Sequence, residues 1–218
     1  MIERYLHHVR TELPGPEETA ATARLRLADK FPRTALRRMT HLGLLIGGAL
    51  DGVALTPEDA VVFASTFGET RALEDFLATF PAASPLLFQT SIHPGSVQQV
   101  LIGRQQPVGR LWPLAGRIRL VEQALLTALL EPAPRVALVG GEERGTWMLE
   151  HRMASTTSFA CAALLTREPA GASGRVAFSP GPAADEACPT LENFTHALAH
   201  RWPLHWPGAG GAWSLEWS

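Results

Sequence analysis

Several residue types and patterns are nearly absent from this 218-residue chain, and each absence excludes a class of protein. Its two cysteines, Cys161 and Cys188, are too few for a disulfide framework and lack the spacing of metal ligands. The longest apolar run, near residues 42–50, is about half as long as a bilayer crossing requires. The first ten residues include no apolar signal segment. The sequence therefore predicts a reduced, cytoplasmic protein without membrane spans.

Motifs that bind nucleotides or present a serine nucleophile are also missing. There is no G-x-G-x-x-G, no G-x-x-x-x-G-K and no G-x-S-x-G elbow. Lysine occurs once, at Lys30, so arginine carries nearly all of the positive charge. A formal net charge of −2 and a pI near 6.4 argue against nucleic acid or a membrane surface as a partner. No cofactor and no metal ion is expected.

The composition is that of a globular protein. Apolar residues make up 46% of the chain, charged residues make up 18%, and the mean hydropathy is +0.04. The length suits one large domain or two small ones.

Apolar periodicity predicts helices and strands in alternation. Helices are expected over residues 34–50, 69–80, 95–103, 117–130 and 190–200. Strands are expected over residues 60–67, 86–92, 111–114, 136–139, 158–166 and 175–178. Such alternation is typical of βαβ units, so the sequence predicts an α/β fold with a mostly parallel sheet.

The chain changes character from Pro169 onward, where Pro, Gly and Ala become frequent. Four of its six tryptophans lie in the last seventeen residues, from 202 to 218. Trp213, Leu215 and Trp217 alternate, which predicts a terminal strand with one packed face. We interpret the tail as a tryptophan-anchored edge, with a ligand platform as the alternative.

Two short segments carry residue types that can act on a substrate. Ser91 and His93 lie at an expected strand-to-helix turn, where amides can bind an anion and the imidazole can act as a base. The alternative is a turn histidine that caps the next helix. Glu142 and Glu143 follow an expected strand and are either an acid–base pair or part of an ordinary exit loop. Cys161 lies in an apolar strand, where a thiolate is disfavoured.

Several segments occur in the order found in one known family. Residues 34–39 (TALRRM) resemble the double-arginine start of its first long helix, and residues 61–69 (VVFASTFGE) resemble its A-S-x-x-G-E turn. Residues 88–95 (FQTSIHPG) are similar to its F-x-x-S-V-H-N-A stretch, with proline in place of asparagine. Residues 114–116 (LAG) resemble its L-S-A-G-E segment, and residues 136–143 resemble its next strand.

The family is that of the β-ketoacyl synthases, and the similarity spans about residues 31–167. More narrowly, the chain resembles the short β-ketoacyl-synthase-like proteins encoded beside aryl polyene and xanthomonadin-type pigment genes. The resemblance implies half of a thiolase-like fold, with a mixed, mostly parallel sheet and flanking helices.

The resemblance also implies a protein that is not an enzyme. In working ketosynthases the elbow after a short strand carries a nucleophilic cysteine, and the matching position here is Gly116, which cannot form a thioester. Two histidines and a lysine come from the second half of that fold, whereas this chain has about half the length and only Lys30.

A partner subunit follows from the same resemblance. In the thiolase fold the strand before the elbow pairs antiparallel across the dimer, and the next helix packs beside it. We therefore expect a heterodimer or larger assembly with a full-length β-ketoacyl synthase, in which this chain is a chain-length factor that shapes the acyl tunnel. An acyl carrier protein is a further candidate partner. The expected interface residues are Leu111, Trp112, Leu114, Ala115, Arg117 and Leu120.

Three segments are expected along the chain. Residues 1–30 form an N-terminal extension, residues 31–168 a ketosynthase-like half domain, and residues 169–218 a Trp-rich segment packed on the same domain. Two other functions stay open. One is an acyl-thioester hydrolase or transferase that uses His93, and the other is a stand-alone module that binds acyl groups or carrier protein.

Overall fold

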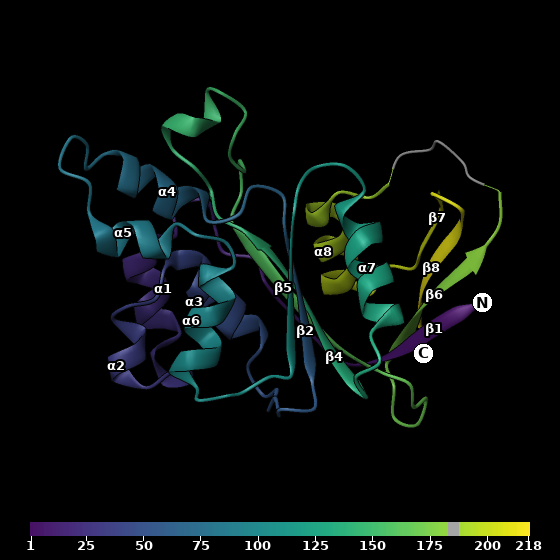
Figure 1. Cartoon of the computed structure of the whole chain (residues 1–218). Coiled ribbons are helices and arrows are strands. Elements are labelled where there is room, and N and C mark those ends of the chain that lie inside the picture. The colour runs from purple at the N-terminus through teal and green to yellow at the C-terminus, as the bar shows by residue number, and fades with distance from the viewer. Residues whose placement is uncertain (183–187) are drawn as a thin grey trace.

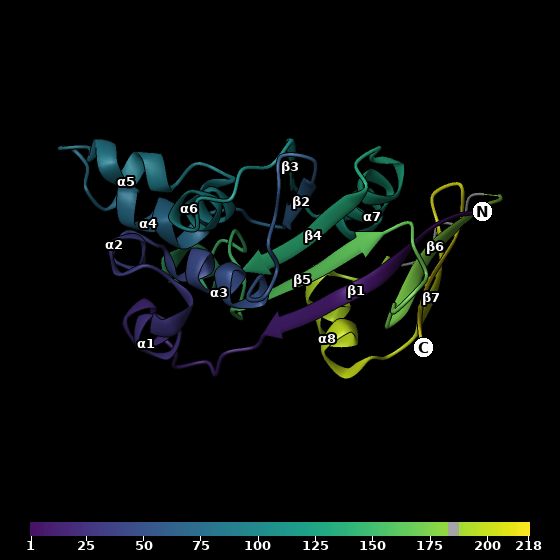
Figure 2. The same cartoon turned by 90° about the horizontal axis from the view of Figure 1, so that it is seen from below.

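The computed structural model describes residues 1–182 and 188–218, which form one eight-stranded sheet with helices on both faces (Figures 1 and 2). The strand order is β3-β2-β4-β5-β1-β6-β8-β7. The strands are β1 (Ile2–Glu12), β2 (Ala60–Ser65), β3 (Arg110–Ala115), β4 (Arg135–Glu142), β5 (Phe159–Thr166), β6 (Gly174–Pro180), β7 (Leu204–Gly208) and β8 (Gly211–Trp217).

The helices are short. They are α1 (Ala20–Arg26), α2 (Arg33–Leu36), α3 (His41–Ala49), α4 (Thr70–Leu77), α5 (Pro85–Thr90), α6 (Gly95–Gly103), α7 (Leu120–Leu130) and α8 (Leu191–His200), with 3₁₀ turns at Ala28–Lys30 and Trp147–Leu149. Across the described residues, none of them is long and apolar enough to cross a bilayer.

The sheet is mixed, as expected, but it is not mostly parallel. β2 pairs in parallel with β3 and with β4. Every other neighbouring pair, from β4–β5 to β8–β7, is antiparallel. The prediction of a mostly parallel sheet was wrong because β4 returns as β5 without a crossover helix and β7 turns directly into β8.

β1 lies inside the sheet, although residues 1–30 are expected to form an extension. It pairs with β5 on one side and with β6 on the other. Its Arg4 is fully buried and donates hydrogen bonds to the carbonyl of Glu131, the C-cap of α7, and to those of Ala133 (3.0 Å) and Pro134 (3.4 Å). Because a helix carries partial negative charge at its C-terminus, this cation stabilises the packing of α7 against β1.

Two apolar layers enclose β2, whose six residues are all buried. Val62 and Ala64 belong to the cluster formed with α7 and α8, whereas Val61 and Phe63 belong to the cluster formed with α3 and α6. This alternation is the two-residue period of a strand with both faces covered. The centre of the molecule is therefore a three-layer α/β/α arrangement.

The helix expected over residues 34–50 is interrupted. α2 ends at Leu36, and α3 starts after Thr40, whose hydroxyl accepts a hydrogen bond from the Gly43 amide at 3.1 Å. A Cβ at Gly47 would lie 2.0 Å from the Phe31 ring, so close packing requires glycine there. Thr40, rather than Thr34, is the cap of the buried helix.

The strand expected over residues 86–92 was wrong, because Pro85–Thr90 is helix α5. Ser84 accepts a hydrogen bond from the Leu87 amide at 3.4 Å, and Pro85 occupies the first turn. A serine cap followed by proline is a helix-start signal that outweighs the apolar run after it. The strands expected at 60–67, 111–114, 136–139 and 158–166 are confirmed as β2, β3, β4 and β5.

The C-terminal tail extends the same sheet. Thr190 caps α8, accepting from the Asn193 amide at 3.1 Å, and β8 pairs with both β6 and β7. The buried rings of Trp206 and Trp213 stack with centroids 5.9 Å apart. The expected terminal strand is confirmed, and these two rings close its inner face.

Candidate functional site

One edge of the sheet is open, and it is formed by β3. This strand pairs with β2 on one side, and most of its residues are exposed. Leu111 packs against the α3–α6 cluster, and Leu114 packs against the α7–α8 cluster. Four of the six expected interface residues, Leu111, Trp112, Leu114 and Ala115, therefore lie on an edge strand whose outer side pairs with no described strand. Such an edge is the usual site for adding another strand.

Trp112 is held in place at this edge although 43% of it is exposed. Its indole Nε1 donates a hydrogen bond to Glu131 Oε2 at 2.7 Å. Glu131 is buried and also accepts from Arg110 at 2.5 Å and from the Ala133 amide at 3.1 Å. Although burial acts to raise the pKa of Glu131, the hydrogen bonds from Trp112, Ala133 and Arg110 outweigh it, so the pKa falls below its usual value. An ionised carboxylate thus fixes the orientation of an exposed aromatic ring.

The other expected interface residues are distributed unevenly. Ala115 and Arg117 are exposed, and the Arg117 guanidinium lies over the Phe67 ring, 4.9 Å from its centroid. Leu120 is buried in the α7 core and does not reach the surface. Ile118, which the sequence analysis did not select, is 81% exposed. The exposed part of the edge is therefore β3 together with the loop before α7.

More exposed apolar residues lie at the carboxyl end of β2 and β4. Figure 1 shows that α4, α5 and the loop between β4 and β5 all lie at this end of the molecule. The exposed large apolar residues of these segments are Leu77, Phe80, Leu86, Phe88, Ile92, Trp147 and Met153. This end of the molecule therefore holds a second group of exposed apolar residues besides those of the β3 edge. Sequence analysis missed α5 because its apolar run was interpreted as a buried strand.

His93 lies next to the site but without catalytic partners. Its ring stacks on Phe63 with centroids 4.8 Å apart, and neither ring nitrogen forms a well-shaped hydrogen bond with the described residues. Burial lowers the pKa of the imidazole, which the backbone of Leu114 partly opposes. Ser91 does not join it, because its hydroxyl donates to the Phe88 carbonyl at 2.8 Å. The lowered pKa favours the neutral ring, and none of the described carboxylates forms a hydrogen bond with it.

Gly116 ends β3 with a positive φ of 143°, and its amide donates to the Ser65 carbonyl at 3.3 Å. A Cβ built there would meet no atom within 4 Å. The position matched to the family's nucleophile is therefore open, and it has a backbone conformation that favours glycine.

Three buried carboxylates surround the same end of the sheet. Glu142 accepts from the Ser65 hydroxyl (3.1 Å) and from the amides of Thr66 and Phe67, and burial raises its pKa to about 7. Glu69 accepts from the Ser96 amide (2.8 Å) and hydroxyl (2.7 Å). Its pKa is also raised to about 7 by burial.

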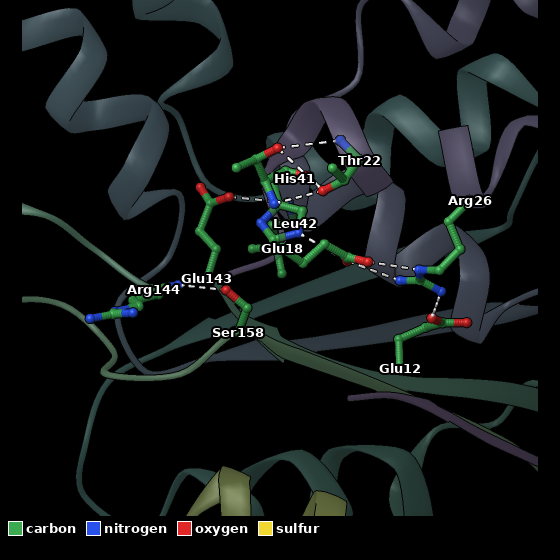
Figure 3. Close-up of polar contacts among 10 residues, drawn as sticks. Glu12, Glu18, Thr22, Arg26, His41, Leu42, Glu143, Arg144 and Ser158 are labelled. Atoms are coloured by element: carbon green, nitrogen blue, oxygen red, sulfur yellow. Dashed lines mark hydrogen bonds and ion pairs between the residues drawn. The ribbon is translucent and has the colours of Figure 1, made fainter. Parts of the chain in front are cut away.

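Glu143 completes the group. It accepts from the Leu42 amide at 3.1 Å at the start of α3, beside the His41–Glu18–Arg26 chain of contacts (Figure 3). Burial and then the neighbouring Glu69 raise its pKa to about 8. Each of the three carboxylates thus binds main-chain amides, so Glu142 and Glu143 support loops and a helix start rather than facing each other as an acid–base pair.

The remaining candidates are distant from this end. Cys161 lies in the core of β5, where burial raises the pKa of its thiol to about 11. Cys188 is partly buried, and burial raises its pKa as well. Within residues 1–182 and 188–218, no group of three or more His, Cys, Asp or Glu side chains is arranged to hold a metal ion.

Comparisons with known proteins identify the fold. No family model matches the chain, and no curated protein is similar to it in sequence. Among solved structures, a ketosynthase in complex with its chain length factor from Xenorhabdus doucetiae matches 99% of this chain and 100% of the other. The TM-score is 0.67 at 18% identity. The chain has a thiolase-like fold.

A second thiolase-like structure, the ishigamide ketosynthase/chain length factor, matches 83% of this chain and 68% of the other, with a TM-score of 0.59 and 14% identity. Both matches confirm the fold expected from the resemblance to ketosynthases, including the α/β half-domain architecture. The thiolase-like alignment with the first structure extends over the Trp-rich tail as well.

Proposed function

We propose that this chain is a non-catalytic, chain-length-factor-like subunit that docks on a full-length β-ketoacyl synthase. The observation that carries the proposal is the open β3 edge, where Trp112 is exposed yet fixed by buried Glu131. A large aromatic ring held rigidly at a surface is typical of the anchor residues that dominate protein interfaces. Two ketosynthase/chain-length-factor structures with the same fold support this choice of partner.

The absence of catalysis rests on the site around Gly116. Glycine offers no nucleophile at the end of β3, and the nearby His93 has no carboxylate to orient it. In our proposal the subunit supplies a binding surface for the ketosynthase and no catalytic residue. We assign to Leu86 and Phe88, two exposed apolar side chains of α5, the role of limiting the length of the partner's acyl tunnel. The pathway would be type II polyketide synthesis of the aryl polyene kind, with acyl-carrier-protein-bound substrates.

Co-expression with the full-length ketosynthase encoded nearest to this chain tests the proposal. We expect one stoichiometric complex by size-exclusion chromatography with light scattering. Ile118→Glu should separate the two proteins, because it places a charge beside β3. Leu25→Glu is the matched control, because Leu25 is also 80% exposed but lies on α1, away from β3 (Figure 2).

Two results would contradict the proposal. One is separate elution of the wild-type chain and the ketosynthase. The other is thioester turnover by the purified chain that His93→Ala abolishes, because this would make it an enzyme in its own right.

A further inference from the structure

The free edge of β3 lacks one main-chain donor. The Gly116 amide donates to Ser65 and therefore faces β2. Along a strand, the main-chain groups of successive residues point to opposite sides. The amides of Trp112 and Leu114 therefore also face β2. Pro113 therefore turns its nitrogen to the free edge, where an edge-strand proline belongs. The outward side offers the carbonyls of residues 111, 113 and 115, but amide hydrogens only at 111 and 115.

The missing donor removes a different number of hydrogen bonds from two kinds of dimer. A strand from another protein that pairs with β3 loses one ladder hydrogen bond, at Pro113. A second copy of this chain brings its own Pro113, so an antiparallel pair of β3 strands loses two. This holds whether the two-fold axis passes through residue 113 or through residue 112, because each strand contributes one missing donor.

We propose that Pro113 selects a different chain over a second copy of this chain at the β3 edge. The inference rests on the proposed function, since it names a ketosynthase strand as the preferred occupant. Pro113 is then a specificity-determining residue that raises the cost of self-association more than the cost of partner binding.

The test restores the missing donor with Pro113→Val, which keeps a residue that favours strands. Each restored hydrogen bond should tighten association about fivefold. The affinity for the co-expressed ketosynthase should therefore rise about fivefold, because one hydrogen bond is restored. Self-association, measured by analytical ultracentrifugation, should strengthen about 25-fold, because two are restored. Pro113→Ala serves as a second variant, and circular dichroism confirms that each is folded.

Pro207→Val is the matched control. Pro207 lies in β7 at the opposite edge and pairs in register with Ala212. It should change neither association. The proposal is overturned if the self-dissociation constant of Pro113→Val equals that of the wild type, if both associations strengthen by the same factor, or if Pro207→Val self-associates equally. A wild-type chain that binds no ketosynthase would refute the proposed function instead, while the self-association measurements still decide the role of Pro113.

Discussion

The two edges of the sheet contrast in what their aromatic residues contact. β3 and β7 each contain a proline, and each ends the sheet. At β7, Trp206 is buried and stacks on Trp213, so the tail buries its own aromatic side chains. At β3, Trp112 is held by Glu131 but remains half exposed. Both edge strands contain a proline, so the prolines do not distinguish the two edges, whereas the burial of the neighbouring tryptophan does.

The largest expected effect concerns folding stability. Trp213→Ala should lower the free energy of unfolding by about 3–5 kcal/mol, because it empties a site where 3% of the side chain is exposed. Trp112→Ala should cost only about 1 kcal/mol, mainly the hydrogen bond to Glu131. Urea denaturation of both variants measures the difference. Equal losses would show that Trp112 is an ordinary core residue and would remove the contrast between the edges.

The second prediction concerns the pH dependence of the free energy of unfolding, which should come from the buried carboxylates near the end of β2 and β4 and not from the tail. Glu69, Glu142 and Glu143 hold protons in the folded state up to pH 7–8, whereas an unfolded glutamate releases its proton near 4.5. The folded state thus binds more protons between these values, so the free energy of unfolding should fall as pH rises from about 5 to 8. Glu143→Gln should reduce this slope and stabilise the protein at pH 8 by roughly 2–4 kcal/mol.

The control for the pH prediction lies in the tail. Glu216 in β8 is paired with Arg175 at 2.8 Å, which lowers the pKa of its carboxyl. Any stability it contributes is lost only in acid, so Glu216→Gln should leave the decline between pH 5 and 8 intact. Urea denaturation of the wild type and both variants at pH 5 and pH 8 measures the decline. A wild-type protein that is more stable at pH 8 than at pH 5 would refute this account of the carboxylates.

The smallest effect concerns the orientation of Trp112. Trp112→Ala should weaken the ketosynthase complex about 30-fold or more, as expected for an anchor residue. Trp112→Phe keeps an aromatic ring but loses the donor to Glu131, so a loss of about fivefold is expected, and Glu131→Gln should give a similar loss. The double variant should be no weaker than either single one. Strictly additive losses, measured by titration calorimetry, would mean that Glu131 does not act through Trp112.

Local sequence signals predicted much of the secondary structure. Apolar periodicity located β2, β3, β4, β5, α6 and α8, because strand and helix periods act over a few residues. The same reasoning failed at α5, where the Ser84 cap and Pro85 override the apolar run, and between α2 and α3, where Thr40 caps a new helix. The failures fall where a single capping side chain changes the outcome.

The site was only partly accessible to the same reasoning. Trp112 and Gly116 were found through the resemblance to ketosynthases, and the structure places Trp112 in the edge strand β3 and Gly116 directly after it. Glu131 was missed because it is distant in sequence from Trp112 and meets it only after α7 packs on the sheet. Leu120 was included among the interface residues because the resemblance implies that the helix after the strand packs beside the interface, whereas its burial became visible only in the structure.

By itself, the sequence determined the positions of most strands, the glycine after β3 and the proline within it, and its resemblance to ketosynthases implied the thiolase-like half domain. The strand positions, the glycine and the proline are properties of neighbouring residues and of residue identity. The tertiary structure alone decided that β1 lies inside the sheet, that five of its seven pairings are antiparallel, and that Glu131 holds Trp112. Strand order and long-range hydrogen bonds depend on which distant segments bury one another's surface, and no local pattern in the chain encodes that choice.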